Sequence, residues 1–204
     1  YISLCNKSLP KTATYALNYL VERGIRKSDV LKWKIGFCCA GEFEGRLIIP
    51  SFDMCGDLNF FIGRAYDGSW IKYRNSESSK DIIFNELFLN FANDVVLVEG
   101  VFDAIKAGEN SIPLLGCSLR ESSRLFSSIV RNKTSVYIAL DTDAEKQSMK
   151  IIKSLLKYDI VVKKVDISPY SDVGEMTKEE FALRKENATI IDSENYLTNR
   201  IMGI

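Results

Sequence analysis

Two acidic clusters in this chain follow directly on apolar runs. Glu99 comes after the run at 95–98, and Asp141 and Asp143 come after the run at 136–140. Unbroken β-branched runs of this kind predict strands buried on both faces of a parallel sheet. Ligand sites on such sheets form beyond the carboxyl ends of the strands, and Mg²⁺ prefers a few close carboxylates. We therefore predict a magnesium site built from these three carboxylates.

The spacing of the acids supports this prediction. In an extended chain, residues two apart point the same way, so Asp141 and Asp143 are expected to face one cation. A later motif, Asp172-Val173-Gly174-Glu175, follows another predicted strand and is expected at the same sheet edge. The alternative is that the acids only cap the following helices or favour their N-terminal dipoles. The joint spacing favours the metal site, and without a cation such close carboxylates should have raised pKa values.

The elements that must position these acids come from the C-terminal half. From about Asp94, predicted strands alternate with predicted helices. The strands are expected at 95–98, 112–115, 136–140 and 160–165, and the helices at 101–108, 119–131 and 145–158. The last helix should cover the sheet with Met149, Ile152, Leu155 and Leu156. This alternation predicts an α/β fold with a mostly parallel sheet flanked by helices.

The N-terminal half shows a different pattern. A helix is expected at 12–22, ending at Gly24, with a second short helix from Ser28 or Asp29. Predicted strands at 47–50 and 58–62 flank a turn at 53–57, and the polar stretch at 74–81 is expected to be a loop. We expect a smaller α+β subdomain at 1–92, followed by the α/β domain at 93–204.

The overall composition excludes several classes of site. The chain has 204 residues, a formal net charge of zero, no histidine, and five cysteines without a Cys-x-x-Cys pair. Histidine-based catalysis is excluded, a structural zinc site is nearly so, and nucleic-acid binding would need a local basic patch. The cysteines are expected to be free thiols in a cytoplasmic protein, and no stretch is typical of a membrane span or secretory leader. Because the chain begins with Tyr1, we expect it to be part of a longer protein.

These motifs carry a resemblance to a known family. Glu99-Gly100 and Asp141-x-Asp143, each after an apolar strand, resemble the toprim domain of bacterial-type primases, topoisomerases and some nucleases. Three blocks before them follow, in order and spacing, those of the bacterial-type (DnaG-like) primase catalytic core, and the likeness runs from about Ala16 to Phe181. The blocks are Gly45-Arg46-Leu47-Ile48-Ile49-Pro50, Phe61-Ile62-Gly63-Arg64 and Lys72-Tyr73-Arg74-Asn75-Ser76, and Leu115-Gly116-Cys117-Ser118-Leu119 stands where the family has a Leu-Gly-Thr segment.

The resemblance implies a function and roles for named residues. It implies template-directed synthesis of short RNA primers on single-stranded DNA, which is a nucleotidyltransferase reaction. The implied catalytic and Mg²⁺- or Mn²⁺-binding residues are Glu99, Asp141 and Asp143, with Asp172 as a further metal ligand. Arg46, Arg64 and Lys72 are the implied nucleotide- and template-binding residues, although solvated or ion-paired surface arginines are the alternative for the first two. The implied partners are single-stranded DNA, ribonucleoside triphosphates and a replicative helicase, without a membrane, at the nucleoid or a phage replisome.

Some residues depart from the family pattern. Ala144-Glu145-Lys146 replaces a small residue and glycine, Gly174 replaces a second aspartate, and a lysine is replaced near Phe84-Asn85-Glu86. Glu145 either adds a ligand or favours the first turn of its helix. The zinc module, the helicase-interacting domain and most of the helical bundle after toprim have no counterpart, and the departures suggest a divergent phage or mobile-element primase. The alternative functions are a toprim nuclease and a degenerate module that only binds nucleic acid; a topoisomerase would need a longer chain.

Overall fold

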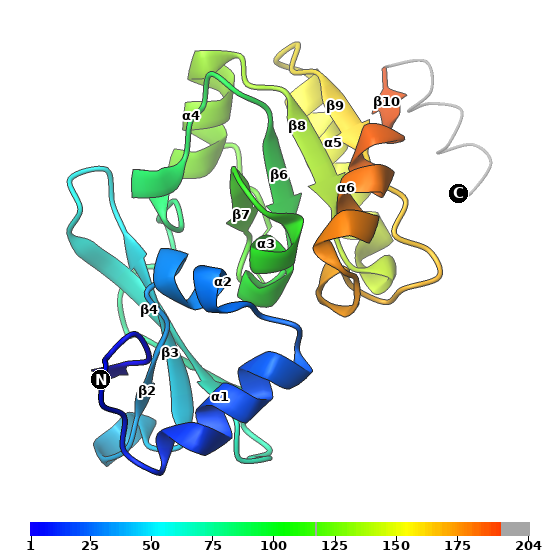
Figure 1. Ribbon diagram of the computed structural model, residues 1–204. Helices are drawn as coiled ribbons and strands as arrows, with labels where there is room; N and C mark the ends of the chain where they lie inside the picture. The colour runs from blue at the N-terminus through cyan, green and yellow to red at the C-terminus, as the bar shows by residue number, and fades with distance from the viewer. Residues whose placement is uncertain (117, 193–204) are drawn as a thin grey trace. The chain divides into compact units, whose positions relative to one another are not determined.

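The computed structural model describes residues 1–116 and 118–192, which form two compact units (Figure 1). Unit 1 runs from Tyr1 to Leu87, and unit 2 begins at Phe88. Each unit has its own five-stranded sheet. The assignment of 1–92 to a primase-type subdomain and of 93–204 to a toprim domain stays a proposal.

Unit 1 is built on an antiparallel sheet with strand order β1-β2-β3-β4-β5. A long hairpin of β3 and β4 forms its centre, and the Asp53 carboxylate fixes the turn by accepting hydrogen bonds from the N–H groups of Cys55 (2.9 Å) and Asp57 (3.0 Å). The strands are Ile2–Ser3 (β1), Gly36–Cys38 (β2), Arg46–Phe52 (β3), Leu58–Ala65 (β4) and Tyr73–Asn75 (β5); the helices are Ala13–Glu22 (α1) and Lys27–Lys32 (α2), with 3₁₀ turns at Gly41–Phe43 (η1) and Glu86–Phe88 (η2).

The core of unit 1 joins one face of α1 to the central hairpin. Ala16 and Leu20 of α1 are at most 1 % exposed, as are Leu47 and Ile49 of β3. The helix predicted at 12–22 is therefore confirmed to within one residue. The loop predicted at 74–81 was wrong at its start, because residues 74 and 75 belong to β5. Ser76 holds that strand against β4 by exchanging two hydrogen bonds with the main chain of Phe61, at 3.0 and 3.3 Å.

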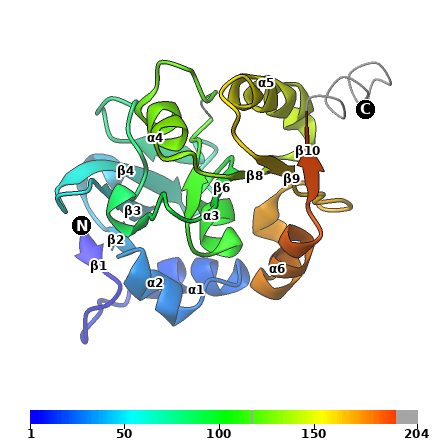
Figure 2. The ribbon, with the colours of Figure 1, turned by 90° about the horizontal axis from the view of Figure 1, so that it is seen from above.

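Unit 2 contains the mostly parallel sheet that the sequence predicts. Its strand order is β10-β9-β8-β6-β7, with only the β10–β9 pair antiparallel. Helices α3 and α6 lie on one side of the sheet and α4 and α5 on the other (Figure 2). The strands are Val95–Val98 (β6), Ser111–Pro113 (β7), Val136–Ala139 (β8), Val162–Lys164 (β9) and Thr189–Ile191 (β10); the helices are Val101–Ala107 (α3), Arg124–Asn132 (α4), Glu145–Leu156 (α5) and Lys178–Glu186 (α6), with 3₁₀ turns at Thr142–Ala144 (η3) and Val173–Glu175 (η4).

The order of the strands creates a switch point beside β6. From β6 the chain passes through α3 to β7 on one side, and then returns through α4 to β8 on the other side. All four residues of β6 are 0 % exposed, as expected for a strand covered on both faces. In open α/β sheets, ligands bind where the strand order reverses, outside the carboxyl ends of the strands. The carboxyl ends of β6 and β8 define that place here.

Two helices differ from their predicted form. The helix predicted at 119–131 begins at Arg124, because the Ser123 hydroxyl caps it by accepting a hydrogen bond from the Phe126 N–H at 3.3 Å. The predicted buried face of α5 is confirmed at Ile152 and Leu155 and wrong at Met149 and Leu156, which are half-buried. The buried residues of the helix are Ser148, Ile151, Ile152 and Leu155. Ser148 is a small polar residue on the buried face of α5, and the spacing of apolar residues in the sequence does not reveal it.

Two expectations about the surface can be compared with the described residues. Cys5, Cys38, Cys39 and Cys55 are free, as predicted, while Cys117 lies outside the described residues. Among the helices of the described chain, none is both long enough and apolar enough to cross a bilayer.

Candidate metal site

Three carboxylates meet beyond the carboxyl ends of β6 and β8. Glu99 directly follows β6, and Asp141 is the second residue after β8. One carboxylate oxygen each from Glu99, Asp141 and Asp143 lies within 4.8 Å of the other two. Glu99 and Asp141 are half-buried and Asp143 is exposed. This spacing allows three oxygens from two strand ends to surround one cation.

We predicted that Asp141 and Asp143 face one cation on the assumption that the chain after β8 is extended. The backbone there is not extended. Thr142–Ala144 form a 3₁₀ turn, closed by a hydrogen bond from the Ala144 N–H to the Asp141 carbonyl at 2.9 Å. The turn is held from outside by the Thr142 N–H, which donates to the Ser171 carbonyl at 3.1 Å. Asp141 and Asp143 therefore converge because of the turn, and the predicted reason was wrong.

The electrostatics of the cluster fit a site for a cation. Burial first, and then repulsion from the surrounding carboxylates with Asp103 foremost, raise the pKa of Asp141 to about 7. Burial also raises the pKa of Glu99, with added repulsion from Asp143 and Asp172. The Oδ1 atom of Asp141 is buried and accepts no hydrogen bond from the described residues. A buried acceptor without a donor, among like charges, is a favourable position for a divalent cation.

Asp103 is a neighbouring acid that our reading of the sequence missed. It is 8 % exposed, and its carboxylate accepts hydrogen bonds from the N–H groups of Gly100 (2.7 Å) and Gly174 (2.9 Å). Burial raises its pKa to about 6, although both hydrogen bonds act in the opposite direction. In sequence it stands at the third position of α3, where an aspartate is expected as an ordinary helix cap. The sequence offered no further signal, because its contact with Gly174 joins segments that are 71 residues apart.

Asp172 lies beside the triad and is not one of its members. It caps η4, where its carboxylate accepts a hydrogen bond from the Glu175 N–H at 3.0 Å, and its charge raises the pKa values of Glu99, Asp103 and Asp141 after larger contributions from burial. A Cβ atom at position 174 would lie 2.9 Å from the Asp103 carboxylate and 3.0 Å from that of Asp172. Glycine at 174, a departure from the primase pattern, therefore lets the main chain approach Asp103 closely.

Glu145 has a partner that the sequence did not reveal. Its two carboxylate oxygens lie 2.7 and 2.8 Å from the Lys164 ammonium at the end of β9. Glu145 is also the first residue of α5, where a negative charge favours the helix dipole. Of the two readings of Glu145, the structure supports the helix-end role, because the carboxylate is held by Lys164 and lies outside the triad.

The three predicted basic residues of unit 1 have different environments. Arg46 is 8 % exposed, and its Nη1 donates to the carbonyls of Ile71 (3.0 Å) and Gly63 (3.4 Å). Arg64 donates from Nε to the Tyr19 hydroxyl at 2.8 Å, and its guanidinium carbon lies 4.6 Å from the centre of the Tyr73 ring. Lys72 is exposed. The nucleotide- and template-binding roles of all three stay predictions.

The replaced lysine block near residue 85 also has a structural role. Asn85 is 5 % exposed; its N–H donates to the Ser51 hydroxyl at 2.8 Å, and its side-chain oxygen accepts from the Phe52 N–H at 3.2 Å. This segment therefore closes over the end of β3 and presents no basic side chain there.

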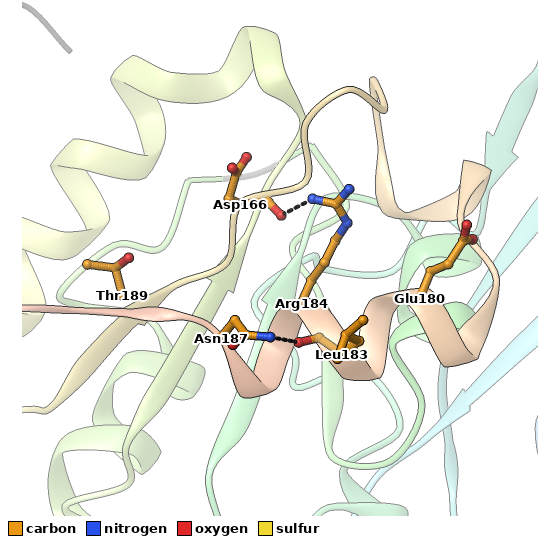
Figure 3. Close-up of a pocket in the computed structure, with 6 residues that line it drawn as sticks. All are labelled: Asp166, Glu180, Leu183, Arg184, Asn187 and Thr189. Atoms are coloured by element: carbon orange, nitrogen blue, oxygen red, sulfur yellow. Dashed lines mark hydrogen bonds between the residues drawn. The ribbon is translucent and has the colours of Figure 1, made fainter.

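A polar hollow of about 440 Å³ lies elsewhere on unit 2, along α6 (Figure 3). Arg184 crosses it and donates to the Asp166 carbonyl at 2.9 Å, and the Asn187 side chain donates to the Leu183 carbonyl at 2.8 Å. None of the predicted site residues lines this hollow. We assign it no role in the candidate site.

Replacing Asp103 with asparagine should weaken Mg²⁺ binding about tenfold, the size expected when a group that orients metal ligands is lost. The two main-chain N–H groups bond to different oxygens of the carboxylate, and in asparagine one of these becomes an NH₂ group, which cannot accept. Isothermal titration of the chain with Mg²⁺ measures the change. Asp159→Asn is the matched control because Asp159 is exposed and has a positive φ that asparagine tolerates. Equal affinities in the two variants would contradict the positioning role.

Replacing Arg46 with alanine should lower the free energy of unfolding of unit 1 by about 2 kcal/mol, through lost packing and two unsatisfied carbonyls. Lys72→Ala should change it by less than about 0.5 kcal/mol, as for exposed sites in general. Urea denaturation followed by the fluorescence of buried Trp33 in unit 1 compares the two variants. An Arg46 that only binds substrate would leave stability unchanged.

Known proteins of similar sequence are DNA primases. No protein-family model matches the chain. The DNA primase of Thermotoga maritima is 29% identical over 180 residues, which cover 80% of this chain and 31% of that protein. The DNA primase of Clostridium acetobutylicum is 30% identical over 177 residues, which cover 78% and 29%. The chain thus spans less than a third of the length of these relatives.

Solved primase structures share the fold. A DnaG primase catalytic domain bound to single-stranded DNA superposes with a TM-score of 0.79 at 19% identity, covering 95% of this chain and 77% of that one. The Escherichia coli primase catalytic core gives 0.76 at 18% identity, with 95% and 79% covered. The Aquifex aeolicus primase, with its zinc-binding and RNA polymerase domains, gives 0.71 at 22% identity, with 89% and 57% covered. In sequence this chain is thus similar to a part of two DNA primases, and its fold is similar to that of solved DnaG primase catalytic domains.

Proposed function

We propose that this chain is the catalytic core of a DNA primase, which joins ribonucleotides into short RNA primers on a single-stranded DNA template. The observation that carries the proposal is the cluster of Glu99, Asp141 and Asp143 at the switch point of the unit 2 sheet. The primase relatives support the choice of reaction among the chemistries that such an acidic cluster can serve.

Glu99, Asp141 and Asp143 would hold Mg²⁺ or Mn²⁺, with Asp172 beside them. The bound cation would offset negative charge on the triphosphate during transfer. In the reaction, the 3′-hydroxyl oxygen of the growing primer forms a bond to the α-phosphorus of a ribonucleoside triphosphate. The bond from that phosphorus to the pyrophosphate breaks, and the pyrophosphate leaves with the electron pair.

The chain's own residues have three tasks in this scheme. Glu99, whose pKa is raised mainly by burial, is our candidate for accepting the hydroxyl proton. Asp103 would position the residue that caps α3 and the turn η4 through its hydrogen bonds from the Gly100 and Gly174 N–H groups. Arg64 and Lys72 would bind phosphates of the template or the triphosphate, and Arg46 would hold the loop from which Lys72 projects.

The experiment is primer synthesis from labelled ribonucleoside triphosphates on single-stranded DNA, without an added primer. Short RNA products that require Mg²⁺ or Mn²⁺ are expected. Metal-dependent degradation of DNA without incorporation would instead indicate a nuclease. DNA binding without either reaction would indicate a module that has lost its activity.

The wider setting of this function also rests on the resemblance. A replicative helicase as partner, and action in the cytoplasm at a nucleoid or phage replisome, stay predictions, as does an origin in a phage or mobile element. Co-purification of a helicase with the protein from its source cells would test the first of these.

A further inference from the structure

Trp70 exposes its indole on the surface of unit 1. It lies in the loop between β4 and β5 and is 91 % exposed, while Trp33, the chain's other tryptophan, is 7 % exposed and stacks on Phe84 with ring centres 6.2 Å apart. Two apolar neighbours accompany it: Ile71 is 50 % exposed and Tyr73 is 46 % exposed. Single exposed apolar residues are ordinary, but a contiguous group that includes an indole is typical of a binding surface.

Main-chain hydrogen bonds hold the loop at Trp70 and at the two residues that follow it. The Lys72 N–H donates to the Trp70 carbonyl at 3.1 Å, and the Lys72 carbonyl accepts from the Ala65 N–H at 3.0 Å. The buried Arg46 guanidinium donates to the Ile71 carbonyl at 3.0 Å. The indole is therefore presented by a fixed backbone, which reduces the entropy lost when a partner binds.

Two basic side chains lie next to these exposed apolar residues. Lys72 is exposed between Ile71 and Tyr73, and Arg64 pairs with Tyr73 across the two strands, with its guanidinium carbon 4.6 Å from the ring centre. The one acid in the loop, Asp67, accepts a hydrogen bond from the Ser69 N–H at 3.0 Å. A partner for this surface must offer flat apolar faces and negative charges at short intervals. A single strand of nucleic acid has both, because its unpaired bases can stack on aromatic side chains while its phosphates meet cations.

We propose that Trp70 stacks on a base of single-stranded DNA, with Lys72 and Arg64 binding the adjoining phosphates. The proposal rests on the proposed function, since the DNA would be the template. Trp70 lies outside the blocks that carry the resemblance to primases. A duplex is a poorer partner, because its bases are already stacked on one another.

The test uses tryptophan emission, because the two tryptophans differ so strongly in exposure. The chain is titrated with an unlabelled oligothymidylate of about 16 nucleotides, within the site size of common single-strand binders. Binding is measured independently by the anisotropy of the same oligonucleotide carrying a dye. Emission of wild type should be quenched in step with binding, whereas Trp70→Phe should bind within about threefold of wild type without quenching, and Trp70→Ala should bind about tenfold more weakly.

Tyr15→Ala is the matched control, because Tyr15 is an aromatic residue of unit 1 that is 71 % exposed. The Tyr15→Ala variant should bind like wild type. In each Trp70 variant Trp33 is the one remaining tryptophan, and emission typical of a buried indole shows that unit 1 is folded. Binding without quenching, or wild-type affinity of Trp70→Ala, would overturn the proposal and leave the proposed function intact. No binding at all would count against both the stacking and the template role. Quenching and binding without primer synthesis would count against the function alone.

Discussion

Asp141→Ala should reduce primer synthesis by at least about 100-fold, the loss typical when one group that stabilises transition-state charge is removed. Asp141 follows β8, and its carboxylate oxygen lies within 4.8 Å of those of Glu99 and Asp143. Without it, two carboxylates would be left to hold the cation. Ribonucleotide incorporation on single-stranded DNA, at saturating Mg²⁺, measures the effect.

A loss of activity is informative only if the variant is folded. Asp141→Asn should lose activity to a similar degree, and in the absence of Mg²⁺ it should unfold at a higher temperature than wild type, because it removes a buried, repelled charge. Asp159→Asn, on an exposed residue, should keep both properties. Wild-type synthesis by either Asp141 variant would exclude Asp141 from the reaction.

Without divalent cations, unit 2 should become less stable as the pH rises from about 4 to 7. Asp141 and Asp103 have folded-state pKa values of about 7 and about 6, against an ordinary value of 3.8, chiefly because of burial. The folded state then binds more protons than the unfolded state, so stability is full below pH 4 and is lost as the pH rises through 6 and 7. At about 1.4 kcal/mol per pKa unit, reduced because solvent reaches Asp141, we expect a loss of about 2–3 kcal/mol.

Thermal unfolding followed by circular dichroism in EDTA, at several pH values, measures this loss. Mg²⁺ should reverse it at pH 8 and have little effect at pH 4.5, because a cation that binds only the folded, deprotonated cluster stabilises it by mass action. The Asp141→Asn variant should show a shallower pH dependence. Stability that is flat with pH in EDTA would contradict the raised pKa values.

The parts of the fold that the sequence predicted are those where local pattern and burial agree. The runs at 95–98 and 136–139 are strands covered on both faces, and such strands carry continuous apolar sequence. Glu99 and Asp141 could be placed because a carboxylate that follows such a run must lie at the carboxyl edge of the sheet. The family resemblance then ordered the blocks of unit 1.

The parts that escaped prediction depend on contacts between distant segments. Asp103 looks like a helix cap until Gly174, which is 71 residues away, is brought to its carboxylate. The partner of Glu145 is a lysine on strand β9, and β5 extends into a polar stretch, which only its pairing with β4 reveals. The 3₁₀ turn after Asp141 is likewise held by the Ser171 carbonyl. Neither composition nor periodicity contains this information.

Gly174 and Asp103 limit how this chain can change over generations. With the Asp103 carboxylate on the main chain of residue 174, any side chain added at 174 meets oxygens at 2.9 and 3.0 Å. A mutation that placed an aspartate at 174 would therefore require the carboxylates of Asp103 and Asp172 to shift. Substitutions at 174 and at these two acids should thus be coupled among close descendants of this chain.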